Sequence, residues 1–371
     1  MRITGLETIF VKPRWSIVKV YTDEGIVGIG EPTLEGRCQT VAAAVQEIGR
    51  YLIGQDPRKI EHHWQAIYRG QFYRGGPVLC SALSGIEQAL WDILGKWLGQ
   101  PVHQLLGGAT RDRIRVYGWL HGETFGDYVA SARAGVEKGF TAFKTGVTGP
   151  ARSVDSLAWV EENVQRFAAI RQAVGPKVDV GIDFHGRVSP ALAIRLARAL
   201  EPYYPLFIEE PVLPENADAL ATVARSTSIP IATGERLFTK WGFREVLEKQ
   251  AAAILQPDLS HAGGILEVKK IAAMAECYYA AVAPHCPLGP VALAACLQLD
   301  ACIPNFLVQE HVTLGEGYLK KPFEIVDGYI AVPQGPGLGI ELDEEALADK
   351  LYDGSWETPR LWHEDGSVAD W

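Results

Sequence analysis

Six acidic or histidine residues recur at almost constant spacing through the second half of the chain, each at the end of a short apolar run. Neighbours are separated by 23 to 27 residues, and the six are Asp183, Glu209, Glu235, Asp258, His285 and Glu310. A repeat of this length fits one strand, one helix and two loops, which is the unit of a parallel β/α barrel. Since all strands of such a barrel open on one face, we expect the six side chains to converge on one pocket.

Two earlier apolar segments, residues 113–119 and 141–146, bring the expected number of barrel strands to eight. Amphipathic stretches at 153–174, 190–201 and 264–278 lie between expected strands and predict helices. The predicted fold class is therefore α/β, a TIM-like barrel with an outer layer of helices.

The first part of the chain has a different pattern, which predicts an α+β lobe. Strands are expected at 2–10, 15–22 and 26–31, with a hairpin turn at Asp23-Glu24-Gly25. Helical patterns follow around 38–53, 58–69 and 78–98. After about residue 320 the repeat is lost, and the remainder is too short to form a domain. We expect an N-terminal lobe at 1–112, a barrel at 113–320 and a C-terminal segment at 321–371 that returns to the lobe.

Composition excludes several classes of partner. The 371 residues carry a formal net charge of −10 and no basic run, which argues against nucleic acid and anionic membranes. None of the six cysteines has CxxC spacing, so neither a zinc site nor a redox site is indicated. No signal sequence or apolar span of membrane length is present, and we expect a cytoplasmic protein with reduced thiols that forms a homo-oligomer.

Asp183, Glu209 and Glu235 end three successive expected strands. Neighbouring parallel strands lie about 4.8 Å apart, so three such carboxylates can share one Mg²⁺ at a ligand distance of ~2.1 Å. The alternative is that all three are capping or salt-bridging acids at the rim, but three in consecutive units favour the metal. Glu210 is adjacent to Glu209 and would point to the opposite face, and spacing alone does not decide between the two.

Two histidines are candidates for acid–base chemistry. His185 lies two residues after Asp183 and should share its face, although a lone histidine is more often structural. His285 and Asp258 end adjacent strands, and a carboxylate bonded to one imidazole nitrogen raises the basicity of the other. The alternative is that this His–Asp pair only braces the two strands.

Glu310 and Lys144 can each be interpreted in two ways. Glu310 is either an acid at the rim or a protonated group that donates to a developing oxyanion. Lys144 ends the second expected strand and is either solvated or in contact with a substrate carboxylate or enolate.

Several motifs along the whole chain resemble those of the enolase superfamily, and within it the acid-sugar dehydratases of the mandelate racemase type. EEP at 209–211 and GER at 234–236 are shared across the superfamily, whereas DFHGR at 183–187 and APHCPLGP at 283–290 are more specific. The closest resemblance is to the galactonate dehydratases. It implies an N-terminal α+β capping domain followed by a (β/α)7β barrel.

The resemblance also implies a role for each candidate residue. Asp183, Glu209 and Glu235 would be the Mg²⁺ ligands, which selects Glu209 over Glu210. His285 with Asp258 would be the base, and His185 the acid. Glu310 would stabilise the intermediate. For Lys144 we expect, from its position at a strand end, a contact with the substrate.

One stretch departs from the pattern of related racemases, many of which carry Lys-x-Lys at the end of the second strand. Here the stretch is Lys144-Thr145-Gly146, so the second lysine is absent. This argues against a racemase with a lysine base on that side. The resemblance implies Mg²⁺-dependent dehydration of an aldonic acid, with D-galactonate as the expected substrate. A dehydratase for another acid sugar, a racemase or epimerase, and a barrel that binds sugar acids without turnover are the alternatives.

Overall fold

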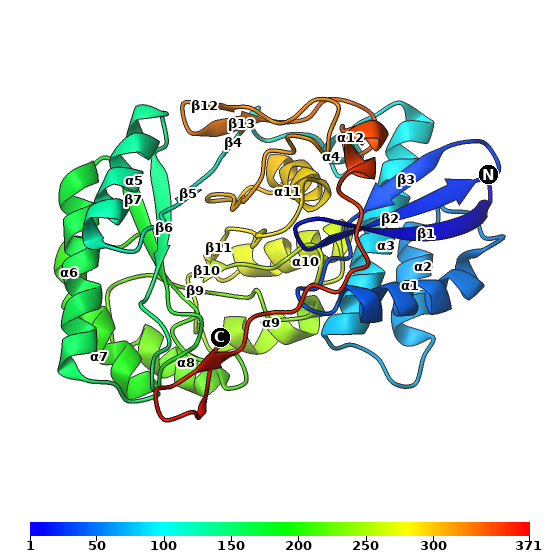
Figure 1. The fold of residues 1–371 in the computed structure, drawn as a ribbon. Coiled ribbons are helices and arrows are strands. Elements are labelled where there is room, and N and C mark those ends of the chain that lie inside the picture. Colours follow the sequence, from blue (N-terminus) through cyan, green and yellow to red (C-terminus); the bar gives the residue numbers. More distant parts are fainter.

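The computed structural model describes residues 1–371, and its N-terminal lobe is an antiparallel meander backed by helices (Figure 1). The meander consists of β1 (Ile3–Val11), β2 (Trp15–Thr22) and β3 (Val27–Gly30). Gly25 has a φ of 75° in the turn between β2 and β3, which confirms the predicted hairpin. The helices are α1 (Cys38–Leu52), α2 (Ile60–Arg69), α3 (Pro77–Leu98) and the short α4 (Val102–Leu105).

Helix α3 is buried along most of its length because it lies between the lobe sheet and the rest of the protein. Gly28 and Gly30 of β3 face Ala89 and Gly85 of α3 so closely that a Cβ atom at either strand position would overlap backbone atoms of the helix. On its other side, α3 reaches the second part of the chain through Glu87, whose carboxylate accepts the backbone N–H of Ile265 at 2.7 Å. One hydrophobic core of 83 buried residues runs through both parts.

The central sheet has seven parallel strands in the order β11-β10-β9-β8-β7-β6-β5. Their bounds in chain order are β5 Gly118–Trp119, β6 Ala142–Gly146, β7 Asp179–Asp183, β8 Ile208–Glu209, β9 Ile231–Thr233, β10 Ile254–Leu255 and β11 Ala281–Val282. The intervening helices are α5 Phe125–Glu137, α6 Leu157–Val174, α7 Pro190–Leu200 with the 3₁₀ turn Glu201–Tyr203, α8 Ala217–Ala224, α9 Thr239–Glu248, α10 Ile265–Glu276 and α11 Pro290–Cys302. This confirms the predicted alternation of strands and helices.

Helix α6 begins later than the sequence predicted. We expected a helix from residue 153, but the Ser156 side chain accepts the backbone N–H of Trp159 and caps the helix there. The residues before it form a loop at the carboxyl end of β6.

The first and last expected barrel strands differ from the prediction. The segment 113–119 is divided: β4 (Arg113–Arg115) pairs antiparallel with β13 (Tyr329–Ala331) in a separate sheet, and only β5 joins the barrel sheet. That separate sheet also contains β12 (Ile325–Val326). The prediction of one continuous strand was wrong because a hairpin remote in sequence occupies the edge of its first half.

Residues 305–310 form no regular strand, but they hydrogen-bond to β11 at one edge of the seven-stranded sheet and to residues 115–117, which precede β5 at the other edge. Leu307 N–H donates to Val282 O at 2.8 Å, Gln309 N–H donates to Arg115 O at 2.9 Å, and Tyr117 N–H donates to Gln309 O at 3.2 Å. On each side the pairing amounts to one isolated parallel bridge: Val282 pairs with Phe306, and Val116 pairs with Gln309.

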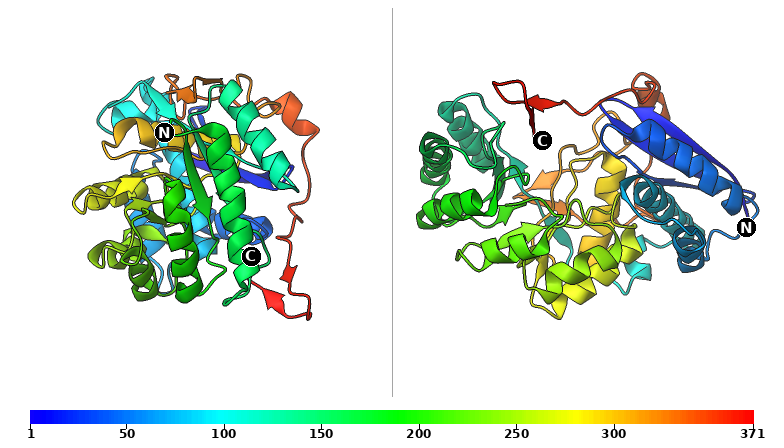
Figure 2. Two further views of the ribbon diagram at one scale, coloured as in Figure 1. Left: turned by 90° about the vertical axis from the view of Figure 1, so that its left-hand side faces the viewer. Right: turned by 90° about the horizontal axis from the view of Figure 1, so that it is seen from below.

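After β12 and β13, the C-terminal segment contacts the N-terminal lobe and then passes back across to the barrel (Figures 1 and 2). Lys12 N–H donates to Lys350 O, and Tyr352 N–H donates to Phe10 O. Helix α12 (Glu344–Ala348) lies in this stretch, and a small hairpin of β14 (Leu361–Trp362) and β15 (Val368–Ala369) follows it. None of the helices combines the length and apolar composition needed to cross a membrane.

Candidate active site

The three predicted metal ligands meet at the carboxyl ends of β7, β8 and β9. Asp183 and Glu209 are the last residues of their strands and lie opposite each other in the parallel register, and Glu235 follows β9 by two residues. One carboxylate oxygen from each lies within 4.8 Å of the other two. Asp183 and Glu209 are buried and Glu235 is half-buried. The convergence predicted from their spacing is therefore found in the structure.

The three carboxyl groups differ in pKa because their neighbours differ. Burial and the nearby charge of Asp183 raise the pKa of Glu209. Burial raises the pKa of Glu235 to about 7, against the opposing effect of His285. Burial also acts to raise the pKa of Asp183, but the charges of His185 and Lys144 outweigh it and bring the value to about 2. Together these shifts indicate that the positive groups nearby do not fully balance the negative charges of the three carboxylates.

Lys144 of β6 supplies the cation nearest to this cluster and is not solvated. Its Nζ lies 2.6 Å from Glu209 Oε1, 3.1 Å from Glu310 Oε1 and 3.4 Å from Asp183 Oδ2. It also lies 4.4 Å from the centroid of the Trp119 ring, within cation–π range. Burial acts to lower the pKa of Lys144, but these carboxylates raise it well above its usual value, so the amine is charged.

Glu210 points away from the triad and has a different role. Its carboxylate accepts from Gly234 N–H at 3.2 Å and from Arg236 Nη2 at 2.6 Å, and Thr233 Oγ1 donates to it as well. Arg236 Nε lies 3.9 Å from Glu235 Oε1, so the Glu210–Arg236 pair supports the loop that carries the third ligand. The choice of Glu209 over Glu210, open from spacing alone, follows from this geometry.

His285 and Asp258 form the expected hydrogen-bonded pair. His285 Nδ1 lies 2.8 Å from Asp258 Oδ2, and the two residues form a parallel bridge beyond the ends of β10 and β11. His285 Nε2 is directed to the other side, 3.6 Å from Glu235 Oε2. Burial acts to lower the pKa of His285, but Glu235, Glu310 and Asp258 raise it well above its usual value.

His185 lies on the other flank of the triad. Its Nδ1 is 3.5 Å from Asp183 Oδ1, and its backbone N–H donates to the same oxygen at 2.8 Å. The residue has a φ of 53°, in the left-handed region that non-glycine residues rarely adopt. Burial lowers the pKa of the imidazole despite the opposing charge of Asp183. The two histidines thus each lie beside a different carboxylate of the triad.

Glu310 lies between Lys144 and His285 and accepts hydrogen bonds. Trp119 Nε1 donates to Oε1 at 2.8 Å, and the Cys286 backbone N–H donates to Oε2 at 2.8 Å. Burial acts to raise the pKa of Glu310, but Lys144, His285 and the Cys286 amide bring it to about 2. In this arrangement Glu310 is ionised, and the indole and the amide hold it in place.

Some residues at the site were not identified from the sequence. Gln256 Nε2 donates to Glu209 Oε2 at 2.7 Å, and Trp119 contacts both Lys144 and Glu310. Gln256 lies two residues before Asp258 in the same strand-end run, so the rule that alternate residues share a face could have identified it. His261 Nε2 lies 3.6 Å from Asp258 Oδ2, and no spacing rule indicated it.

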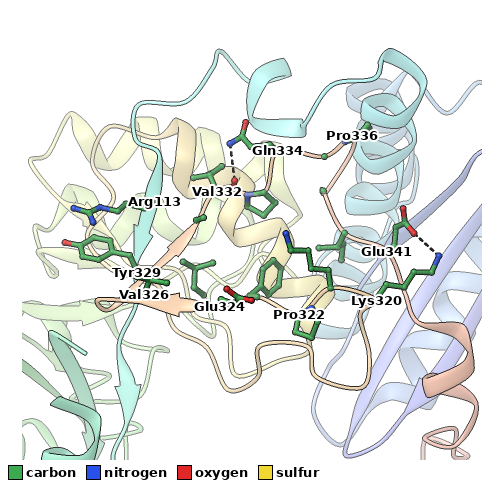
Figure 3. Close-up of a pocket in the computed structure, with 18 of the residues that line it drawn as sticks. Arg113, Lys320, Pro322, Glu324, Val326, Tyr329, Val332, Gln334, Pro336 and Glu341 are labelled. Atoms are coloured by element: carbon green, nitrogen blue, oxygen red, sulfur yellow. Dashed lines mark hydrogen bonds and ion pairs between the residues drawn. The ribbon is translucent and has the colours of Figure 1, made fainter. Parts of the chain in front are cut away.

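A cavity of about 970 Å³ lies away from these residues (Figure 3). It is lined by residues of 320–341 together with Lys96 and Arg113, and Arg113 begins β4 at the amino-end side of the barrel sheet. Its walls contain Lys320 paired with Glu341 at 2.8 Å, and both side chains are exposed. No candidate catalytic residue lines it, so it is separate from the site at the carboxyl ends of the strands.

The donor set of the triad fits a hard divalent cation. On an octahedral Mg²⁺ with ligands at ~2.1 Å, opposite ligands lie about 4.2 Å apart and adjacent ligands about 3.0 Å apart. Three oxygens within 4.8 Å of one another can therefore close onto one cation by moving inward. The triad and Glu310 contribute four carboxylates, and Lys144 lies within 3.4 Å of three of them as a single positive charge. A divalent cation would offset two of the three negative charges that remain.

An α+β lobe packed on a parallel β/α sheet, with an acidic triad flanked by two histidines at the strand ends, defines a metal-assisted acid–base enzyme class. Residues 7–107 match the model of the mandelate racemase / muconate lactonizing enzyme N-terminal domain, and residues 127–346 match the enolase C-terminal domain-like model. The chain therefore belongs to the mandelate racemase / muconate lactonizing enzyme family of the enolase superfamily, which confirms the resemblance drawn from its motifs.

Full-length relatives carry a more particular name. A protein of Ralstonia nicotianae named D-galactonate dehydratase is 51% identical over 382 aligned positions, which cover 100% of both chains. A D-galactonate dehydratase of Cronobacter sakazakii is 49% identical over 100% of both chains. Among solved structures, a mandelate racemase/muconate lactonizing enzyme from a Sulfitobacter species is 39% identical with a TM-score of 0.91, covering 95% of this chain and 96% of that one.

Proposed function

We propose that this chain is a Mg²⁺-dependent hydro-lyase that converts D-galactonate into 2-keto-3-deoxy-galactonate. The observation that carries the proposal is the acidic triad with a His–Asp pair on one flank and a second histidine on the other. The name shared by relatives about half identical over their full length supports the choice of acid sugar.

We infer that the seven-stranded sheet is closed into a (β/α)7β barrel by residues 305–310. Their hydrogen bonds to β11 on one side and to residues 115–117, directly before β5, on the other side support this. So does an interior cluster with one buried residue from almost every barrel segment: Tyr117, Ala142, Phe207, Ala232, Ile254, Ala283 and Val308. In this division, residues 1–112 form the capping domain, 113–320 the barrel and 321–371 a segment returning to the capping domain.

Asp183, Glu209 and Glu235 would hold the Mg²⁺. A proton next to a carboxylate is very weakly acidic because its removal places two negative charges on one small group. A bound divalent cation supplies the Lewis-acid stabilisation of that charge. Lys144 lies beside the triad and adds a fixed positive charge to the same pocket.

His285 would remove the proton at C2. In the neutral imidazole, Asp258 accepts the hydrogen of Nδ1, which leaves the Nε2 lone pair as the base and fixes the ring. A divalent cation on the triad would offset the Glu235 charge that raises the pKa of His285. Nε2 points toward Glu235 and therefore toward the place where a ligand of the metal would bind. The electron pair of the broken C–H bond forms an enediolate, and Glu310 and Lys144 lie beside the pocket in which its charge develops.

His185, in its imidazolium form, would protonate the departing hydroxyl at C3, and its lowered pKa makes that form a stronger proton donor. The electrons of the enediolate form a C2–C3 double bond, the C–O bond at C3 breaks, and water leaves with the proton from His185. The enol product becomes the 2-keto-3-deoxy acid. Because the histidines lie beside different carboxylates, base and acid approach the substrate from different sides.

A dehydratase for another acid sugar, or an epimerase, is the alternative. Residue 146 is glycine, where related racemases carry the second lysine. A Cβ there would meet only the Asp183 carbonyl oxygen, at 3.8 Å, so the space that a side chain would use is open. This disfavours a racemase with a lysine base on that side. We expect the protein to be cytoplasmic and to form a homo-oligomer. We also expect it to bind neither nucleic acid nor membranes, since the net charge is −10 with no basic run.

The test is incubation of the purified protein with Mg²⁺ and each of a panel of aldonic acids, followed by mass spectrometry. Loss of water from D-galactonate, with the highest kcat/KM of the panel, supports the proposal. Preference for another aldonate would reject the substrate while keeping the reaction. Unchanged mass with inverted C2 stereochemistry would identify an epimerase. If no acid sugar changed in mass or stereochemistry, the remaining alternative would be a barrel that binds sugar acids without turnover.

A further inference from the structure

The two histidines beside the triad are held in place in different ways. The His285 ring is fixed by a hydrogen bond of 2.8 Å to Asp258. The His185 imidazole forms no side-chain hydrogen bond: its Nδ1 is buried and has only a 3.5 Å contact with Asp183 Oδ1. A contact of that length fixes the orientation of the ring weakly, so packing against a neighbouring ring contributes to it.

The aromatic contact of His185 is made by the last residue of the chain. The rings of His185 and Trp371 pack edge to face, with centroids 5.6 Å apart and an interplanar angle of 89°. This is the T-shaped arrangement that aromatic pairs prefer. The indole is 45% exposed, so it forms an outer wall over His185 rather than part of the core.

Residues 353–371, here called the C-terminal strap, bring Trp371 to this position from the N-terminal lobe (Figures 1 and 2). At the lobe, Gln39 Nε2 donates to Asp353 O at 2.7 Å, and Arg14 lies over the Trp356 ring at 5.3 Å. At the far end, Arg152 of the loop after β6 lies 3.3 Å from Asp365, and Ala369 is buried. The Arg152–Asp365 pair is half exposed and contributes little by itself.

We propose that Trp371 is a positioning residue for His185, and that the strap carries it from the lobe to the carboxyl-end face of the barrel to complete the acid side of the site. This inference rests on the proposed function, which makes His185 the acid. Deletion of the indole would let the imidazole rotate and admit water on that side. It would leave the triad and the His285–Asp258 pair unchanged, because none of these residues forms a hydrogen bond, ion pair or ring contact with Trp371. Protonation of the leaving hydroxyl would then suffer, whereas removal of the C2 proton would not.

The kinetic test separates these two steps in D₂O with Mg²⁺ and D-galactonate. Proton removal is measured as keto acid plus C2-deuterated galactonate, and elimination as keto acid alone. Trp371→Ala should lower elimination about 10- to 100-fold, the range for a displacement of about 1 Å in a catalytic group, while total proton removal stays within a few-fold of wild type. Trp371→Phe, which keeps an aromatic edge, should recover most of the elimination. Trp362→Ala is the matched control, since Trp362 is 54% exposed on the same hairpin and has no ring partner, and it should behave as wild type.

A second measurement needs no substrate. In protein labelled with ¹³C at histidine Cε1, the His185 resonance is identified by its loss in His185→Asn. Trp371→Ala should shift it, because the indole ring lies within ring-current range, and Trp362→Ala should not. An unshifted resonance, an equal fall in both kinetic steps, or elimination at the wild-type rate in Trp371→Ala would each overturn the inference. If the wild type formed no keto acid from any aldonate, the proposed function would fail, and the role of Trp371 in elimination would fail with it. The His185 resonance would still show whether the Trp371 ring packs against the imidazole.

Discussion

Replacement of Asp258 by asparagine should slow the removal of the C2 proton without unfolding the protein. The carboxylate accepts a hydrogen bond from His285 Nδ1 at 2.8 Å, and Ser260 N–H donates to its other oxygen at 2.7 Å. A hydrogen bond to a charged group is worth about 1.5–3 kcal/mol. Since ~1.4 kcal/mol corresponds to a factor of ten, loss of the charge should reduce the rate about 10- to 150-fold.

A second effect raises the upper limit. The side-chain amide introduced by the substitution could turn its NH₂ group toward Nδ1, which would move the ring hydrogen to Nε2 and remove the lone pair that acts as the base. General-base loss typically costs about 10²–10⁴-fold. The expected range for Asp258→Asn is therefore about 10- to 10⁴-fold, with the KM for D-galactonate changed much less.

The assay is incorporation of deuterium at C2 and formation of keto acid in D₂O, both followed by NMR. Asp218→Asn is the matched control, because Asp218 is an exposed aspartate paired only with Lys249 at 2.7 Å. It should behave as wild type. Wild-type proton removal by Asp258→Asn would refute the assignment of His285 and Asp258 as the base.

The remaining predictions concern the metal, the acid and a buried carboxyl group. Glu235→Gln should lose Mg²⁺ affinity but keep its fold, which isothermal titration with Mg²⁺ measures. EDTA should abolish wild-type activity until Mg²⁺ is restored, and full activity after exhaustive chelation would contradict the metal site. His185→Asn should still bind Mg²⁺ and exchange the C2 hydrogen with retention but form little keto acid, and keto acid at the wild-type rate would show that His185 is only structural. Burial raises the pKa of Glu31 to about 7 from a usual value near 4.5, so the folded state binds the extra proton and stability should fall as pH rises between these values, by about 3 kcal/mol in total. Urea unfolding in EDTA should show that Glu31→Gln loses this slope, and a slope equal to wild type would contradict the prediction.

The candidate site was predictable where strand ends alone determine position. Asp183, Glu209 and Glu235 follow apolar runs at constant spacing, and parallel strands bring such ends together whatever the detail of the helices. Spacing could not choose between Glu209 and Glu210. That choice depends on Arg236, which binds Glu210 at 2.6 Å and directs it away from the triad.

Contacts between remote segments were not predictable. The segment 113–119 has the pattern of one strand, yet β4 pairs with β13, more than 200 residues later in the chain. The state of Glu310 depends on Lys144 and Trp119, which lie on other strands. The edge-to-face contact of Trp371 with His185 depends on the path of the whole C-terminal strap, for which the sequence carries no periodic signal.

The most direct test of the central claim is an NMR time course of wild-type protein with Mg²⁺ and D-galactonate in D₂O. We expect the C2 proton signal to disappear as 2-keto-3-deoxy-galactonate forms, and neither change to occur after removal of Mg²⁺. Formation of the C2 epimer without loss of water, or formation of keto acid in the absence of a divalent cation, would contradict the central claim.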